Sequence, residues 1–214
     1  MEIRAYNELY LDDAMQNLGD MIDYAVHDCG YEPDTFFQMF LVSGIATSFE
    51  RGNPKYVVGM SGVELARAVL RGVNAATDFP EPTYSPDCSR EYWAGWILAY
   101  YQWLKKKRFE DIVEEGLPLS RICDMYILHE ADESKFVEQA DMIIERYRSN
   151  RISKLQRIRK ARGFTQQQLS EASGVTLRMI QLYEQRRNDI NKAQVNVVLS
   201  LSKALGCDVE DILE

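Results

Sequence analysis

The sequence contains few of the residues that build metal centres and disulfides. It has only four cysteines and two histidines among 214 residues. A zinc site is therefore not expected, and reduced thiols in a cytoplasm are the simplest interpretation. We predict no metal and no other cofactor. The cysteines are scattered, with no Cys-x-x-Cys pair: Cys29, Cys88, Cys123 and Cys207.

Long apolar runs and a secretion signal are also missing. No stretch approaches the roughly 18 uncharged apolar residues of a membrane-spanning helix. The N-terminus, Met-Glu-Ile-Arg-Ala-Tyr, does not show the pattern of a signal peptide. We therefore expect a cytoplasmic protein that does not bind membranes.

Common catalytic motifs are absent. The sequence has no glycine-rich phosphate loop, no His-Glu-x-x-His and no Gly-x-Ser-x-Gly. His27-Asp28 resembles the metal-binding pair of HD-type hydrolases, but only His129 remains to extend it. A surface histidine beside an acidic residue is the better interpretation. We predict that the chain is not an enzyme, and a helical enzyme with an appended module is the least favoured alternative.

Acidic and basic residues are unevenly distributed along the chain. The formal net charge is −8. Residues 151–214 carry 11 Lys and Arg against 7 Asp and Glu, a net of +4, so residues 1–150 have a net charge of −12. A single arginine is more often a solvated surface charge, but this asymmetry favours a basic, phosphate-binding module. We predict two domains, residues 1–149 and 150–214, and the 46% apolar content allows each domain a core.

Residues 163–184 show the pattern of two short helices joined by a tight turn. Thr165 and Gln168 form a Thr-x-x-Gln capping box at the start of the first helix. Leu169 and Ala172 are predicted to face inward. Gly174 suits the reversal of the chain because glycine adopts positive φ at little cost. A polar capped helix without further function would explain the capping box alone, but not the whole pattern.

The second helix of this pattern separates a buried side from an outward side. Thr176 is a natural N-cap, and Ile180 and Tyr183 are predicted to point into the core. The spacing leaves Leu177, Arg178 and Gln181 outward. A helix presented in this way fits the major groove of DNA.

The pattern resembles the Cro/C1-type (Xre-like) helix-turn-helix family over residues 150–214. The resemblance implies a five-helix DNA-binding domain in which Glu184 pairs with Arg159. It also implies that Gln166 contacts a phosphate and that the second helix reads bases. Two departures are Ser170, where the family usually has alanine, and the absence of the usual glycine after Glu184. With the neighbouring arginines, the predicted DNA-binding residues are Gln166, Thr176, Leu177, Arg178, Gln181, Arg157, Arg186 and Arg187.

Residues 1–149 are predicted to be helical almost everywhere, with a loop at Pro80, Pro82 and Pro86, which makes the protein all-α. Apolar residues recur at helical spacing in residues 5–29, 33–52, 61–72, 90–107, 119–130 and 133–148. One helix carries all three tryptophans, in a stripe made of Trp93, Trp96, Tyr100 and Trp103. Such a stripe is usually core, but Trp and Tyr are also enriched where proteins bind partners.

These features predict a transcriptional regulator that binds a double-stranded DNA operator as a homodimer. An acidic domain before a DNA-binding module resembles the architecture of antitoxins in toxin–antitoxin systems, which neutralise a toxin and repress their own operon. A basic protein partner, such as a cognate toxin, would suit that domain. The alternative is a repressor whose N-terminal domain senses a small molecule between its helices.

Overall fold

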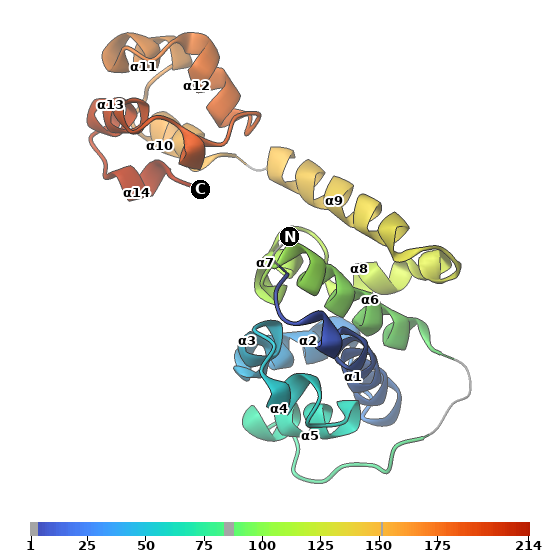
Figure 1. The fold of residues 1–214 in the computed structure, drawn as a ribbon. Coiled ribbons are helices and arrows are strands. Elements are labelled where there is room, and N and C mark those ends of the chain that lie inside the picture. The colour runs from blue at the N-terminus through green and yellow to red at the C-terminus, as the bar shows by residue number, and fades with distance from the viewer. Residues whose placement is uncertain (1–3, 84–87, 151) are drawn as a thin grey trace. The chain divides into compact units, whose positions relative to one another are not determined.

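The computed structural model describes residues 4–83, 88–150 and 152–214. The chain forms two compact units, Met1–Ile144 and Glu145–Glu214, each with its own core. Helices are the only regular structure in the described ranges, so the predicted all-α class is confirmed (Figure 1). None of the helices described in these ranges is long and apolar enough to cross a membrane.

The first unit is built around two helices whose backbones come close together. α1 (Leu11–Asp23) packs against α6 (Arg90–Lys105), and glycines at the crossing make this possible. A Cβ atom on Gly95 would lie 2.5 Å from the Leu18 carbonyl oxygen, and one on Gly19 would lie 2.9 Å from the Tyr92 carbonyl oxygen. Side chains larger than hydrogen at these positions would force the helices apart.

The remaining helices of this unit surround that pair. The segment predicted as one helix over residues 33–52 is two helices, because Gly44 between them has a left-handed φ of 76°. Phenylalanines from α2, α3 and α7 meet in the core beneath them, with Phe40 and Phe109 5.7 Å apart. The helices are α2 (Pro33–Val42), α3 (Ile45–Glu50), α4 (Pro54–Val57), α5 (Gly62–Gly72), α7 (Phe109–Glu114) and α8 (Leu119–Asp124), with a 3₁₀ helix η3 (Tyr126–Glu130) after α8.

α9 (Glu133–Asn150) begins in the first unit and continues into the second. Its buried side includes Phe136, Ala140 and Ile144. Asp141 holds it to α6, because its carboxylate accepts a hydrogen bond from the Tyr101 hydroxyl at 2.8 Å and lies 2.6 Å from Lys105 Nζ. α9 ends at Asn150, beside the boundary between residues 149 and 150 predicted from the sequence.

The described residues 152–214 form the five α-helices predicted for this domain. They are α10 (Lys154–Ala161), α11 (Gln166–Ser173), α12 (Leu177–Glu184), α13 (Val195–Leu205) and α14 (Val209–Ile212). Leu169, Ile180, Leu201 and Ile212 are fully buried among them. The prediction for Ala172 is wrong: this residue is exposed, and Val175, which follows the C-cap Gly174, lies in the core instead.

Candidate nucleic-acid interface

Local hydrogen bonds hold the start of α11 and the turn between α11 and α12. The Thr165 hydroxyl accepts from the Gln168 backbone N–H at 3.1 Å, and the Gln168 side chain accepts from the Thr165 N–H at 2.9 Å. Gly174 has a φ of 71°, which closes α11 in the left-handed region. Ser170 donates to the Val175 carbonyl at 2.7 Å, so the hydroxyl that replaces the usual alanine satisfies a backbone oxygen of the turn.

α12 has one buried and one accessible side, as its sequence predicts. Ile180 and Tyr183 are 0% and 6% exposed. On the other side, Arg178 is exposed, and Leu177 and Gln181 are half-buried. Among the described residues, none forms a hydrogen bond or ion pair with the Arg178 side chain. The guanidinium is therefore available to a ligand.

A buried ion pair fixes α12 to the helices that precede it. Arg159 on α10 donates from Nε to Glu184 Oε1 at 2.5 Å and from Nη2 to Glu184 Oε2 at 3.0 Å. The two residues are 6% and 4% exposed. The hydrogen bond to Glu184 raises the pKa of Arg159 above its ordinary value. Because the pair is bidentate, it sets both the distance and the orientation of the helices.

Gln166 joins the same network from α11. Its Nε2 donates to Glu184 Oε2 at 2.7 Å, so one carboxylate ties α10, α11 and α12 together. This bond uses one of the two amide N–H groups of Gln166 and leaves the other for a further acceptor. Gln166 is also the first residue of α11, where the helix dipole favours an anion.

The chain leaves α12 through a residue with an unusual backbone. Arg186 has a φ of 55°, in the left-handed region that side chains other than glycine rarely adopt. Its guanidinium forms an ion pair with Glu214, and its Nε is buried without a hydrogen-bond partner in the described chain. Glu214 also accepts from the Lys154 backbone N–H at 2.9 Å, at the start of α10. Arg186 is therefore held within the domain, whereas Arg187 is exposed.

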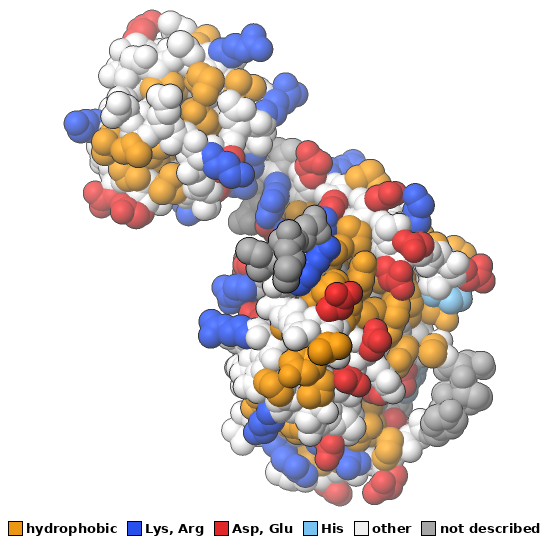
Figure 2. Space-filling view, in the orientation of Figure 1, with side chains coloured by type: hydrophobic (Ala, Val, Ile, Leu, Met, Phe, Trp, Pro, Cys, Tyr) orange, Lys and Arg blue, Asp and Glu red, His pale blue; other side chains and the backbone are white. Residues whose placement is uncertain are grey.

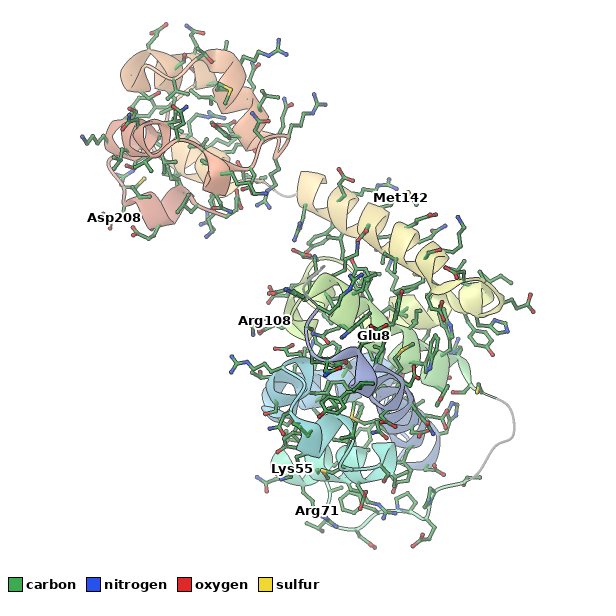
Figure 3. All side chains as sticks on the ribbon, in the orientation of Figure 1. Glu8, Lys55, Arg71, Arg108, Met142 and Asp208 are labelled. Atoms are coloured by element: carbon green, nitrogen blue, oxygen red, sulfur yellow. The ribbon has the colours of Figure 1, made fainter. Side chains whose placement is uncertain are left out.

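Exposed cations lie at several places on this unit. Blue side chains project from its outline in Figure 2, and Figure 3 shows the corresponding sticks. Arg157 is exposed on α10. Arg162 is exposed too, and its Nη2 donates to the Gly206 carbonyl at 3.0 Å. The other exposed cations among residues 152–214 are Lys160, Arg178, Arg187, Lys192 and Lys203.

The tryptophan stripe of α6 is mainly part of the core of the first unit. Trp93 and Trp103 are 7% and 5% exposed, and Trp103 Nε1 donates to the Tyr6 carbonyl at 2.9 Å. Trp96 and Tyr100 are half-buried. Trp93 and Trp96 also line a pocket of about 260 Å³. Tyr126 and His129 complete its wall, and the sequence had not indicated them because they belong to a short 3₁₀ helix without a strong pattern.

The histidine in the His27-Asp28 pair is bound to neighbouring carboxylates. His27 Nε2 lies 3.1 Å from Glu91 Oε2 and 3.7 Å from Asp23 Oδ1. In the part of the chain that the structure describes, no group of three or more His, Cys, Asp or Glu side chains is placed to hold a metal ion.

Comparison with known proteins identifies one segment. A family model described as "Helix-turn-helix" matches residues 155–212, which run from α10 to the end of α14. No curated protein and no solved structure matches the chain.

Proposed function

We propose that this DNA-binding transcription regulator, whose residues 155–212 form a helix-turn-helix domain of the Cro/C1 type, is an autorepressing antitoxin. In this proposal it binds its operator as a homodimer, and its N-terminal unit binds and neutralises a basic protein. The observation that carries the DNA-binding part is an accessible Arg178, without a partner among the described residues, on a helix that a buried ion pair fixes in place.

α12 is the helix that we place in the major groove. Arg178 has the length and the two parallel donors to bind guanine O6 and N7. Gln181, about one turn further along α12, suits adenine N6 and N7, and Leu177 suits a thymine methyl group. Thr176, the N-cap of α12, would lie at the end of the helix that lines the groove.

Phosphate contacts would hold the helix in register. Gln166 retains an amide N–H at the N-terminus of α11, and Arg157 and Arg187 are exposed. These three groups are suited to neutralise or hydrogen-bond the DNA backbone. Arg186 is different, because Glu214 binds its guanidinium. We assign Arg186 to positioning the exit of α12.

A second copy of the chain would supply the second recognition helix. Two-fold symmetry places such helices in successive major grooves, about 34 Å apart, on a pseudo-palindromic operator. Val195 and Leu199, one turn apart on α13, are 72% and 38% exposed. A self-complementary contact between two copies would cover them.

The N-terminal unit has the surface expected for a basic partner. Residues 1–150 carry a net charge of −12. Figure 2 shows acidic side chains among hydrophobic ones on the visible face of this unit. Ile127 and Met142 are 77% and 57% exposed, and Met142 lies on α9 (Figure 3). Acidic and apolar groups on one surface favour a protein with a basic, partly apolar interface.

The two halves of this proposal are tested together by one pair of assays. DNase footprinting with the full-length protein on DNA upstream of its own gene should reveal two protected half-sites one helical turn apart. Co-expression should restore growth to cells that produce the toxic neighbouring gene product. A full-length variant with Arg178→Ala and Gln181→Ala should lose the footprint and still restore growth. Loss of both activities would contradict the division of labour between the units.

A small-molecule sensor is the second candidate, and the aromatic pocket beside α6 favours it. Such a repressor would release its operator when a ligand is added, without any protein partner. The antitoxin proposal is favoured if metabolite extracts of the host leave operator binding unchanged and the product of a neighbouring gene alters it.

A further inference from the structure

The pocket of the first unit is walled by aromatic rings. It lies between α6, η3 and the start of α9, and Trp93, Trp96, Tyr126 and Phe136 contribute to its lining. The rings support one another, because Trp93 meets Tyr126 and Phe136 edge-on, with centroids 5.9 and 5.8 Å apart. Aromatic walls of this kind attract cations through the negative faces of their rings.

Two groups that line the pocket can accept hydrogen bonds, the Glu133 carboxylate and the His129 ring. Glu133 lines it and has no hydrogen bond or ion pair with any described residue. His129 Nδ1 lies 2.7 Å from the Tyr126 carbonyl oxygen, so Nδ1 must donate the proton there. In the neutral ring this leaves Nε2 as an acceptor. A carboxylate and a ring nitrogen beside aromatic faces favour a ligand that is cationic and donates hydrogen bonds.

We propose that this pocket receives one arginine side chain of the basic protein partner. This inference rests on the proposed function and names the site at which that partner is anchored. A guanidinium stacks on aromatic rings and presents planar donors to a carboxylate, which an ammonium group does less well. Interfaces often concentrate their affinity in a single Trp, Tyr or Arg seated in such a pocket.

Size, charge and exposure favour a side chain over a free metabolite. The volume of about 260 Å³ is below the roughly 300–1,000 Å³ typical of small-molecule sites. The net charge of −12 on residues 1–150 attracts a basic protein. Ile127, next in sequence to the lining residue Tyr126, is 77% exposed, which leaves an apolar group beside the pocket for the partner to cover.

The three tryptophan indole signals in a ¹⁵N spectrum of the full-length protein provide the first test. The probe is N-acetyl-arginine methylamide, and its neutral analogue with citrulline is the control. We expect the arginine probe to shift the signals of Trp93 and Trp96 and to leave that of the buried Trp103 unchanged. Glu133→Gln should weaken binding of the arginine probe about tenfold or more. The control is Glu145→Gln, which removes an exposed carboxylate from the same helix and should leave that binding unchanged.

Other results would overturn the inference. Phenethylamine, a small free amine, serves as a second probe. If it shifts the Trp93 and Trp96 signals and the arginine probe does not, the pocket is a site for a free amine. No shift from either compound would show that the pocket does not bind cations.

The partner itself distinguishes the failure of this site from the failure of the proposed function. In full-length protein, Glu133→Gln should weaken binding of the neutralised protein about tenfold and leave operator binding unchanged. Unchanged partner affinity would refute the arginine pocket while leaving the antitoxin proposal intact. If no neighbouring gene product is neutralised by the wild-type chain, the proposed function itself fails.

Discussion

Replacing Arg159 with methionine should lower the thermal stability of the second unit and leave that of the first unit unchanged. The substitution keeps much of the aliphatic packing but leaves the Glu184 carboxylate buried, with Gln166 Nε2 as its remaining hydrogen-bond donor among the described side chains. Removing one partner of a buried ion pair typically costs about 3–5 kcal/mol. In a domain of this size, about 1 kcal/mol lowers the melting temperature by roughly 4–8 °C. We therefore expect the melting temperature of this unit to fall by roughly 12–40 °C.

The distribution of tryptophans makes the effect measurable in the full-length chain. Trp93, Trp96 and Trp103 all lie in the first unit, so tryptophan fluorescence follows that unit alone. Far-UV circular dichroism follows the helices of both units. In Arg159→Met, we expect a new low-temperature transition in the dichroism, with no change in the fluorescence melting curve.

A double variant separates the unpaired charge from the loss of packing. Arg159→Met with Glu184→Leu removes both charges, and apolar replacements of buried ion pairs are often neutral or stabilising. The Phe164 carbonyl still loses its hydrogen bond from Arg159 Nη1 in this variant. We therefore expect the free energy of unfolding to recover to within about 1–3 kcal/mol of the wild-type value. A double variant that is as unstable as the single one would refute the argument, because packing rather than charge would then be responsible.

Three further substitutions test the remaining assignments. Arg178→Ala should cost about 1–3 kcal/mol on the operator and relax specificity at one base pair; equal weakening on all DNA would show that Arg178 contacts phosphate only. Arg157→Ala should weaken binding to operator and random DNA alike and lower the slope of log affinity against log salt by about 0.9; a loss confined to the operator would contradict a phosphate contact. Arg186→Gly should be about 1 kcal/mol more stable than Arg186→Ala in thermal melts, because only glycine accepts a φ of 55° without strain; equal stabilities would show that the left-handed backbone carries no cost there.

Local signals were sufficient to predict the helix-turn-helix. The capping box of Thr165 and Gln168, the N-cap at Thr176 and the turn at Gly174 all occur as predicted. Each depends on hydrogen bonds or dihedral angles within about four residues, so the sequence contains the whole interaction. The all-α class follows in the same way, from apolar residues repeated at helical spacing. Arg159 and Glu184 are 25 residues apart in the sequence, and their pairing was predicted from the family resemblance alone.

Contacts between distant residues were decided by the tertiary structure. Only the fold brings Glu214 to Arg186 and turns Val175, in place of Ala172, into the core. Only the packing of η3 and α9 against α6 makes a pocket beside Trp96, since Tyr126 and Phe136 lie 30 or more residues further along the chain. The physical reason is that propensities and caps act between near neighbours, while burial and ion pairing depend on which helices meet. The sequence by itself thus determined the helical class and the caps and turn of α11 and α12, and the packing of the helices determined which side chains are buried or paired and which stay exposed.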